Sequence, residues 1–266
     1  MQLNNESKTL FIPLYAKALM SKENLFISDL KAEEIISKVE FNFKKLKQSK
    51  WLSMYIAARS KIIDDICNEN IKNNSNLTVI HLGCGLDSRA LRVNQNYNKW
   101  YDLDFEDVID LRKKFYIESN KYKMISKSVT DLKWLDEIKN NNEEVLIIAE
   151  GLTMYLSEQE IKTIIKGINE KLKNVTLVFD AYSKKAVKAS KYKNPVNQMN
   201  ATIKWGMSKP NDFCKLNESL KFINCHLIKY KAEKLKGLTK FIFENLYCGK
   251  IANSLYRIYE FKLDDK

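Results

Sequence analysis

The stretch Leu77-Thr78-Val79-Ile80-His81-Leu82-Gly83-Cys84-Gly85-Leu86-Asp87 decides the fold of this chain. Its apolar first half predicts a buried strand, and its two glycines predict a tight turn that leads into a helix. Glycine tolerates positive φ and lets a ligand approach the main chain closely, and the helix that follows offers free N–H groups. A strand, a glycine turn and a helix in this order indicate a ligand-binding turn in an α/β fold.

The composition is that of one large domain, because 45% of the 266 residues are hydrophobic. No apolar run approaches the ~18 residues that a membrane-spanning helix needs, and the N-terminus lacks the basic-then-apolar pattern of a signal peptide. The five cysteines are scattered and form no Cys-x-x-Cys pair, so neither a zinc site nor a disulfide framework is indicated. We therefore expect a cytoplasmic protein with no bound metal and no membrane partner.

The net charge of +12 raises the question of a nucleic-acid partner. Only five of the 45 basic residues are arginines, however, and the rest are lysines. Arginine is the preferred residue for bidentate recognition of phosphates and bases. The composition therefore favours a solvated lysine surface, and we expect no nucleic-acid partner.

The predicted secondary structure changes at about residue 73. Residues 1–72 predict an N-terminal helical cap, with helices that begin after Ser7 or Thr9, after Ser28 and near Ser49. Strands and helices alternate from there on, which predicts a doubly wound α/β sheet, mostly parallel, with an antiparallel pair at one edge. The expected strands are 77–82, 99–103, 122–126, 144–149, 174–180, 221–229 and 255–263.

The expected helices of this second part are 86–92, 105–119, 130–139, 157–172, 183–205 and 235–248. Ser157 and Glu160 fit a capping box at the start of the fourth of them. Residues 73–182 would form a ligand-binding core, 183–209 a helical insertion or lid, and 210–266 the edge strands. The whole chain would be a single domain, and its oligomeric state cannot be inferred.

Acidic side chains follow three of the predicted strands. Asp102 and Asp104 end the second strand, Glu150 ends the fourth and Asp180 ends the fifth. Ligands of open α/β sheets bind at the carboxyl ends of the strands, and an acid about 20 residues after a glycine turn is typical of ribose binding. Asp104 stands at that separation from Gly85.

A dinucleotide and S-adenosylmethionine both suit such a turn. A dinucleotide needs a third glycine, where this chain has Ser88, and the negative charge of Asp87 would oppose its phosphates. S-adenosylmethionine has no phosphate and carries cationic groups, so the acids favour it. Arg59 lies on the apolar stripe of a predicted helix, where a charged group needs an anionic partner; it would either bind a ligand or pair with a local carboxylate.

The run from Val79 to Arg89 resembles the first motif of the leucine carboxyl methyltransferase-like family, a class I S-adenosylmethionine-dependent group with bacterial small-molecule O-methyltransferases of polyketide biosynthesis. Residues 12–18, 56–65, 101–104 and 148–156 agree in the same order, so the resemblance covers about residues 9–180. It implies a Rossmann-like class I methyltransferase sheet with S-adenosylmethionine as the cofactor.

The resemblance also implies cofactor contacts. Arg59, with Lys17, would hold the methionine carboxylate, and Glu150 would face the ammonium group. Gly83 and Gly85 would bring the main chain against the cofactor.

The other implied contacts concern the nucleoside. Asp104, or failing it Asp102, would bind the ribose, and Ser128 and Val129 would flank the adenine. His81 replaces the asparagine that many family members carry, and a packed strand histidine is the more frequent situation.

The resemblance implies an O-methyltransferase acting on a carboxyl or hydroxyl group of a small molecule. A carboxylate acceptor, with a pKa near ~4, is already ionised at neutral pH, whereas a phenol, near ~10, would gain from a general base. Tyr155, Asp180 and His226 are the candidates for such a base. The acceptor itself cannot be inferred.

Three alternatives stay open. A protein carboxyl methyltransferase would need a surface that recognises its partner, and none is distinctive in the sequence. A nucleic-acid amino-methyltransferase would carry an Asn/Asp-Pro-Pro-aromatic motif after the fourth strand, where this chain reads Ala149-Glu150-Gly151-Leu152. A module that binds S-adenosylmethionine without turnover would keep the cofactor contacts and lose only the chemistry.

Overall fold

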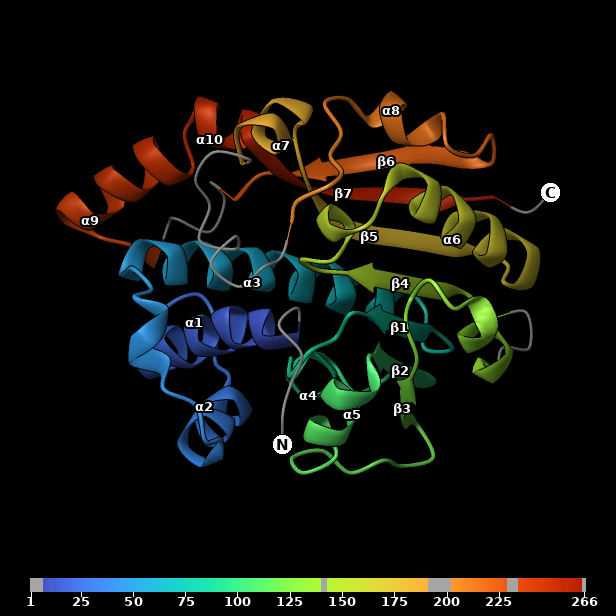
Figure 1. The fold of residues 1–266 in the computed structure, drawn as a ribbon, viewed down its shortest axis with the longest axis horizontal. Coiled ribbons are helices and arrows are strands. Elements are labelled where there is room, and N and C mark those ends of the chain that lie inside the picture. Colours follow the sequence, from blue (N-terminus) through green and yellow to red (C-terminus); the bar gives the residue numbers. More distant parts are fainter. Residues whose placement is uncertain (1–6, 140–142, 191–201, 229–233, 265–266) are drawn as a thin grey trace.

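The computed structural model describes residues 7–139, 143–190, 202–228 and 234–264. They form a seven-stranded sheet in the order β3-β2-β1-β4-β5-β7-β6 (Figure 1). The pairs from β3 through β5 are parallel, whereas β7 is antiparallel to both β5 and β6. This confirms the doubly wound sheet with an antiparallel edge. The strands are β1 Thr78–Leu82, β2 Lys99–Asp104, β3 Tyr122–Ser126, β4 Val145–Ala149, β5 Val175–Tyr182, β6 Leu220–His226 and β7 Tyr256–Leu263.

Helices pack against both faces of this sheet. The α-helices are α1 Phe11–Lys22, α2 Leu30–Lys38, α3 Lys50–Asn73, α4 Arg89–Arg92, α5 Glu106–Arg112, α6 Glu158–Lys171, α7 Lys184–Ser190, α8 Pro210–Cys214, α9 Gly237–Ile242 and α10 Lys250–Leu255. Shorter helical turns are η1 Ser7–Leu10, η2 Phe43–Leu46, η3 Leu132–Glu137, η4 Thr153–Tyr155 and the π-turn η7 Phe243–Tyr247.

Successive residues of β4 face opposite sides of the sheet. Leu146 and Ile148 belong to a buried cluster that also contains residues of α1, α2 and α3. Ile147 and Ala149 belong to a second cluster, which contains residues of α6 and η3. Because side chains alternate along a strand, a strand that is buried on both faces is apolar throughout. This is why Val145–Ala149 could be recognised in the sequence as a central strand.

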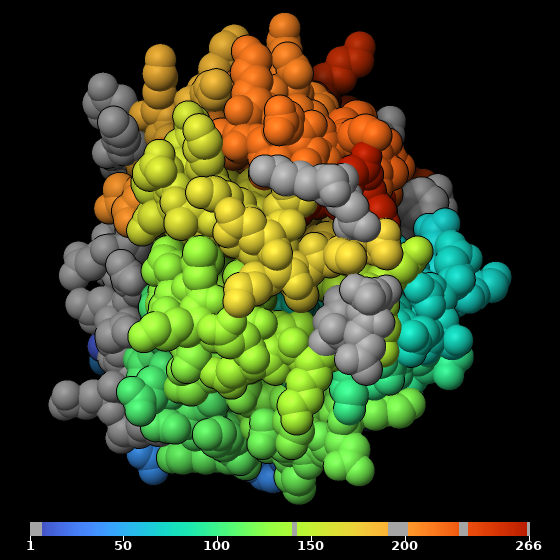
Figure 2. Space-filling view, turned by 90° about the vertical axis from the view of Figure 1, so that its right-hand side faces the viewer, coloured from blue at the N-terminus to red at the C-terminus, as the bar shows by residue number. Residues whose placement is uncertain are grey.

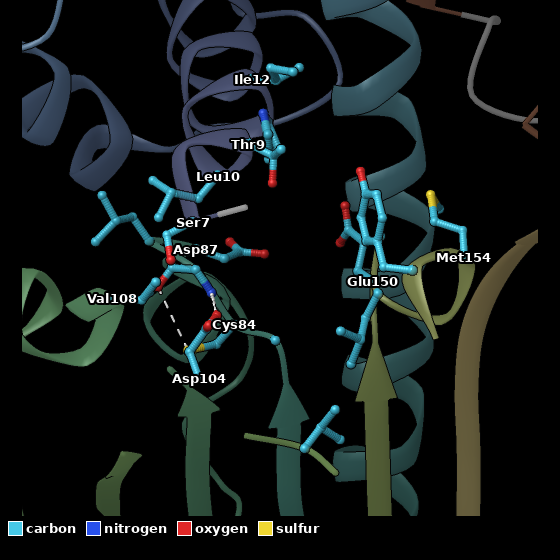
Figure 3. Close-up of a pocket in the computed structure, with 18 of the residues that line it drawn as sticks. Ser7, Thr9, Leu10, Ile12, Cys84, Asp87, Asp104, Val108, Glu150 and Met154 are labelled. Atoms are coloured by element: carbon cyan, nitrogen blue, oxygen red, sulfur yellow. Dashed lines mark hydrogen bonds between the residues drawn. The ribbon is translucent and has the colours of Figure 1, made fainter. Parts of the chain in front are cut away.

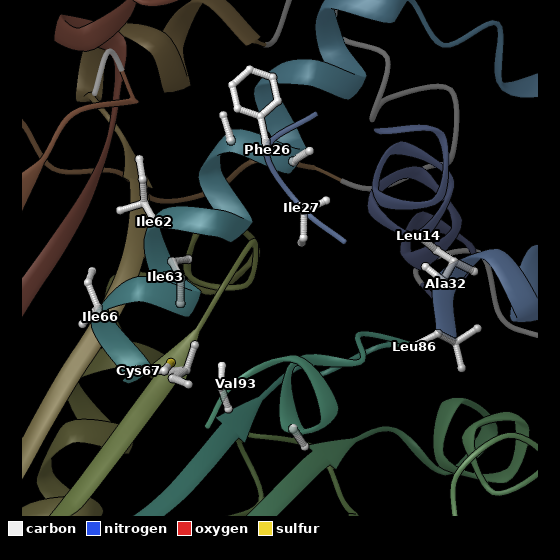
Figure 4. Close-up of a cluster of buried hydrophobic side chains, with 14 of the residues drawn as sticks. Leu14, Phe26, Ile27, Ala32, Ile62, Ile63, Ile66, Cys67, Leu86 and Val93 are labelled. Carbon is white, nitrogen blue, oxygen red and sulfur yellow. The ribbon is translucent and has the colours of Figure 1, made fainter. Parts of the chain in front are cut away.

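The helix α3 ties the N-terminal region to the sheet. Its residues Ile62, Ile63, Ile66 and Cys67 pack in the first cluster, and Figure 4 shows Cys67 at the end of α3 that lies nearest to Val93. The parallel strands begin at the right-hand side of the sheet in Figure 1. Segments coloured green to orange form the surface on that side (Figure 2). In the described ranges, no helix combines the length and apolar character that crossing a bilayer requires.

The capping box at α6 is confirmed, since Ser157 accepts the Glu160 N–H and the Glu160 side chain accepts the Ser157 N–H. Two other predicted caps are wrong. Asp29 caps α2 in place of Ser28, by accepting the Ala32 N–H at 2.8 Å. The first helix has no side-chain cap, because the turn η1 precedes it.

Several predicted helices are shorter than expected. The helix predicted over 105–119 ends at Arg112, after which the chain turns and the Tyr116 hydroxyl donates to the Leu86 carbonyl at 2.9 Å. The segment 130–139 contains the 3₁₀ turn η3 rather than an α-helix. The helix predicted over 235–248 is α9 followed by the π-turn η7, and α10 was not predicted.

The insertion predicted over 183–209 begins as α7, and 191–201 lie outside the described residues. Residues 202–207 are not helical, contrary to expectation. Trp205 and Met207 pack in the second core cluster, and the Lys204 N–H donates to the Met154 carbonyl at 2.8 Å. This stretch is held by its packing against the sheet and η4, and it does not form a helix.

Candidate cofactor and acceptor site

A cavity of about 630 Å³ lies at the carboxyl ends of the parallel strands. Its walls come from the N-terminal helices, from α3, from the glycine turn after β1 and from the segments that follow β2, β3, β4 and β5. Figure 3 shows Asp104 and Glu150 at the ends of their strands, with Thr9 and Ile12 of the N-terminal region across from them. The volume falls in the range of about 300–1,000 Å³ that is usual for small-molecule sites.

The glycine turn forms one wall of this cavity. Gly83 and Gly85 have φ angles of 62° and 53°, in the left-handed region that glycine adopts without strain. A side chain at Gly83 would also crowd Leu152, because an added Cβ would lie 3.1 Å from its nearest methyl carbon. The turn therefore presents bare main chain to the cavity, as the sequence predicted.

Asp104 is held in place by the main chain alone. Its Oδ2 accepts the Gly85 N–H at 2.7 Å and its Oδ1 accepts the Phe105 N–H at 2.8 Å. Burial raises the pKa of Asp104 to about 6, although these two N–H groups act in the opposite direction. Each oxygen accepts one of these hydrogen bonds, so each can accept another, and Asp104 lines the cavity. Asp104 is thus a hydrogen-bond acceptor that no cation of the described chain occupies.

Asp102, the predicted alternative to Asp104, does not line the cavity. It is fully buried and binds the Arg112 guanidinium, the Tyr122 hydroxyl at 2.7 Å and the Trp100 indole N–H at 2.8 Å. Burial opposes its ionisation, but Arg112, His81 and Tyr122 together outweigh this effect and lower the pKa of Asp102. Asp102 lies on the same face of β2 as Asp104 but two residues farther from the carboxyl end of the strand, and these partners give it a structural role.

Glu150 is bound by two arginines at the floor of the cavity. Its Oε1 accepts from Arg59 Nε at 3.0 Å and from the Ser60 hydroxyl at 2.8 Å, and its Oε2 accepts from Arg89. Burial opposes the charge of Glu150, yet Arg59 and Arg89 hold its pKa well below the usual range. The carboxylate therefore stays ionised at any working pH.

Arg59 has several anionic partners. Besides Glu150, its Nη1 lies 3.0 Å from Asp180 Oδ2 and donates to the Tyr256 hydroxyl at 2.8 Å. Of the two possibilities left open for Arg59, the pairing with local carboxylates is confirmed; the binding of a ligand stays a prediction, which the position of Arg59 in the cavity wall permits. Its presence on an apolar stripe follows from these partners, since α3 packs over the ends of β4 and β5.

Lys17 also lines the cavity, and its Nζ lies 2.9 Å from Asp87 Oδ1. Asp87 pairs in addition with Arg89 and Arg92, and Arg92 continues to Asp64 on α3. The charge of Asp87 is therefore balanced by three cations. Asp87 should therefore repel a phosphate group less than we expected. The sequence alone does not show its three cationic partners.

Ser128 and Val129 follow β3 and line the cavity beside the glycine turn. The Trp134 indole N–H donates to the Val129 carbonyl at 3.0 Å, and the Ser128 hydroxyl lies 2.8 Å from Thr130 Oγ1. The loop is thereby fixed next to Asp104. The structure brings all the predicted cofactor contacts except Asp102 to one cavity.

The other end of the cavity is lined by four tyrosines, of which only Tyr155 was predicted. Tyr256 packs against Tyr182 and Tyr55, with ring centroids 4.7 and 6.0 Å apart. Burial raises the pKa of all four phenols. They remain neutral O–H donors at physiological pH. Nothing in the sequence linked Tyr55, Tyr182 or Tyr256 to the site.

Two of the three candidate bases lie outside the cavity. Asp180 is fully buried, where it accepts from the Gly151 N–H at 2.7 Å and from the Tyr256 hydroxyl. His226 lies on the edge strand β6 with its Nε2 3.1 Å from Glu260. Tyr155 does line the cavity, but burial raises its pKa, so it holds its proton too strongly to act as a base near neutral pH.

Three arginines that the sequence did not link to the site are buried around it. Arg89 and Arg112 are fully buried, and Arg92 is almost so. Arginine suits buried ion pairs because its planar group makes several fixed hydrogen bonds. The chain thus places nearly all its few arginines in the interior near the cavity, and lysine supplies its surface charge.

Residues 1–169 match the family model described as leucine carboxyl methyltransferase. The tetracenomycin polyketide synthesis O-methyltransferase TcmP of Streptomyces glaucescens is 30% identical over 223 residues, which are 83% of this chain and 82% of that protein. The S-adenosyl-L-methionine-dependent methyltransferase dpfgK of Gibberella zeae is 27% identical over 232 residues, 79% of this chain and 78% of that protein.

A solved structure supports the fold. The magnesium protoporphyrin IX methyltransferase of Synechocystis, with bound S-adenosylhomocysteine, superposes with a TM-score of 0.51 at 12% identity. The match covers 87% of this chain and 92% of the other. The seven-stranded, mostly parallel sheet thus has a class I methyltransferase architecture.

Proposed function

The chain belongs to the leucine carboxyl methyltransferase family and is an S-adenosylmethionine-dependent methyltransferase, and we propose that it methylates a carboxylate oxygen of a small molecule. The observation that supports a carboxylate acceptor is that none of the three candidate bases suits the tyrosine-lined end of the cavity: Asp180 and His226 do not line it, and Tyr155 keeps its proton. An ionised carboxylate needs no base, whereas a hydroxyl acceptor would gain from one.

The residues of the cavity suit S-adenosylmethionine. Lys17 and Arg59 would hold the methionine carboxylate, and Glu150 would bind the ammonium group. Each of these side chains already has partners of opposite charge, at 2.9 Å for Lys17 and 2.8 Å for Arg59 with Glu150. The zwitterion of an amino acid matches such a set of paired charges, because it brings one charge of each sign and leaves the total unchanged.

The nucleoside end has acceptors and bare main chain. Asp104 would accept from ribose hydroxyls, because both its oxygens are fixed by backbone N–H groups and neither is held by a cation. Gly83 and Gly85 would allow close approach of the main chain. Ser128 and Val129 would flank the adenine from the loop after β3.

When bound, S-adenosylmethionine supplies an electrophilic methyl group on a good leaving group. The chain's own contribution is to align the acceptor and to exclude water, and alignment alone can lower a barrier by about 7–11 kcal/mol. An apolar wall beside Arg59 is formed by Met154 and Tyr155 of η4 and by Leu52 of α3. The neutral hydroxyls of Tyr55 and Tyr182 are donors that can hold one carboxylate oxygen while the other receives the methyl group.

A paired acceptor screen tests this proposal. Purified protein is incubated with S-adenosylmethionine and small carboxylic acids, each beside its own methyl ester and beside a phenol of similar size. We expect saturable release of S-adenosylhomocysteine with at least one acid and none with its ester. Release with phenols alone would contradict the carboxylate assignment. Release only with a protein extract would point to a protein carboxyl methyltransferase.

A further inference from the structure

A surface formed by α9, η7 and α10 exposes an unusual number of large apolar side chains. Leu238, Phe241, Leu246 and Ile251 are 73%, 65%, 71% and 79% exposed. They fall within one short stretch of the chain, whereas most other large apolar residues of the described chain are buried. Large exposed apolar groups that gather in one segment mark an interaction site more often than scattered single ones do.

This apolar stretch is strongly basic. Residues 234–255 contain the lysines Lys234, Lys236, Lys240 and Lys250 and a single acid, Glu244. Three of the lysines are exposed, and Lys240 lies 3.9 Å from Glu244. We call these four lysines and the four apolar residues above the α9–α10 surface.

The α9–α10 surface stands at one end of the molecule. Figure 1 shows α9 projecting outward from the body, with α10 beside it. Its inner side is anchored, because Phe243 is fully buried and the Tyr247 ring stacks on Trp51 of α3 with centroids 5.7 Å apart. The outward orientation of the apolar side chains is therefore set by a packed inner face.

The surface adjoins the cavity. Trp51 precedes the cavity-lining residue Leu52, and α10 leads directly into Tyr256, which lines the same end. A layer in contact with α9 and α10 would thus lie beside the tyrosine-lined end.

We propose that the α9–α10 surface docks the protein on the surface of an anionic lipid bilayer. Short helices that carry leucine and phenylalanine together with lysine bind in the plane of a membrane interface, where apolar side chains enter the lipid and lysines meet the headgroups. The net charge of +12 acts in the same direction. Charge complementarity favours lipid over a second copy of the chain, because two-fold pairing would bring the two sets of lysines together.

Vesicle co-sedimentation tests the proposal. The full chain is mixed with vesicles of phosphatidylcholine alone, or with vesicles in which one lipid in three is phosphatidylglycerol. We expect binding to the anionic vesicles that is at least tenfold stronger than to the neutral ones and that weakens as salt is added. No binding of the wild-type chain to anionic vesicles would overturn the proposal.

Matched variants locate the contact. Leu238→Asp and Phe241→Asp should each reduce the binding to anionic vesicles at least tenfold. Ile117→Asp makes the same change at a residue that is 90% exposed after α5, and it should leave the binding unchanged. Equal loss in all three variants, or no loss in the first two, would contradict the assignment. Retained S-adenosylmethionine binding shows that each variant is folded.

Sedimentation velocity distinguishes the other occupant. If the wild-type chain forms a dimer that Phe241→Asp dissociates, and does not bind vesicles, then the surface pairs two copies and the membrane proposal fails. A monomer that binds anionic vesicles agrees with it.

Discussion

Two nitrogens of Arg59 bind one oxygen of Glu150: Nε lies 3.0 Å and Nη2 lies 2.8 Å from Oε1. Arg89 binds the other oxygen from the opposite side, beneath the glycine turn. The helix α3, the turn after β1 and the end of β4 therefore meet at a single carboxylate. This contact sets the charges of the cavity floor before any ligand arrives.

Removing the Arg59 guanidinium should have two effects. Arg59→Ala should weaken S-adenosylmethionine binding by tenfold or more, about 1.4 kcal/mol, because a partner of the methionine carboxylate is lost. It should also lower the free energy of unfolding by about 3–5 kcal/mol, since Glu150 and Asp180 are left buried with fewer cations. Calorimetric titration and denaturant unfolding measure the two quantities.

The matched control is Arg59→Lys. Lysine keeps the charge but has only one nitrogen to contact Glu150. The affinity of this variant for S-adenosylmethionine should therefore lie between those of the wild type and the alanine variant. Wild-type affinity in both variants would rule out this arginine as a cofactor contact.

The two acids at the end of β2 should respond differently to removal of their charge. Asp104→Asn should weaken S-adenosylmethionine binding at least tenfold, because an amide accepts fewer hydrogen bonds than a carboxylate does. Asp102→Asn should lower the free energy of unfolding by about 3–5 kcal/mol, because it leaves Arg112 buried without its partner. The folded fraction of this variant should bind the cofactor nearly as the wild type does. The reverse pattern would assign the ribose contact to Asp102.

Asp104 should make both stability and binding depend on pH. Its pKa in the folded chain is raised to about 6, so the folded state binds the proton more tightly than the unfolded state does. Its contribution to the free energy of unfolding is then largest below pH ~4 and is lost as the pH rises to about 6. Asp104→Asn should therefore remove this dependence of the free energy of unfolding on pH between about 4 and 6, which denaturant unfolding at a series of pH values measures.

Binding should follow the opposite course. Ribose hydroxyls donate to the ionised carboxylate, so the affinity of the wild type for S-adenosylmethionine should fall as the pH drops below about 6. This dependence should be absent in Asp104→Asn. Titrations at a series of pH values check it, and an equal dependence in the variant would assign the effect to another group.

None of the three candidate bases suits that role at the tyrosine-lined end of the cavity, so we expect mild effects when they are replaced. Loss of a true general base typically costs about 10²–10⁴-fold in rate. Tyr155→Phe should lower kcat less than tenfold, because the hydroxyl acts only as a donor, and His226→Gln should leave kcat within about twofold. A fall of more than a hundredfold in either variant would contradict acceptance by a carboxylate that is already ionised.

The sheet could be predicted from the sequence because its strands carry strong signals. The run Val145–Ala149 is apolar on both faces, β5 is apolar up to Phe179 apart from Thr176, and the glycine turn marks the end of β1. The same logic located Asp104 and Glu150, since acids that follow buried strands collect at one edge of the sheet. The helix limits were less accurate, because tertiary contacts such as that of Tyr116 with Leu86 decide where a helix ends.

The parts of the site that depend on distant partners could not be predicted. Nothing local shows that Asp87 is neutralised by Lys17, Arg89 and Arg92, or that Asp102 turns away to Arg112. The tyrosines of the second half of the cavity come from α3, η4, β5 and β7, and their convergence is a product of the fold. Spacing along a chain reports one element at a time, whereas an acceptor pocket is assembled from many.

The chemical stability of the product tests the central proposal most directly. The protein is incubated with S-adenosylmethionine labelled in its methyl group and with an acid from the acceptor screen, and the isolated product is treated with mild alkali. A carboxyl methyltransferase makes a methyl ester, so we expect the label to be released as volatile methanol. Label that stays on the product would show a methyl ether or a methylated nitrogen, and it would contradict transfer to a carboxylate.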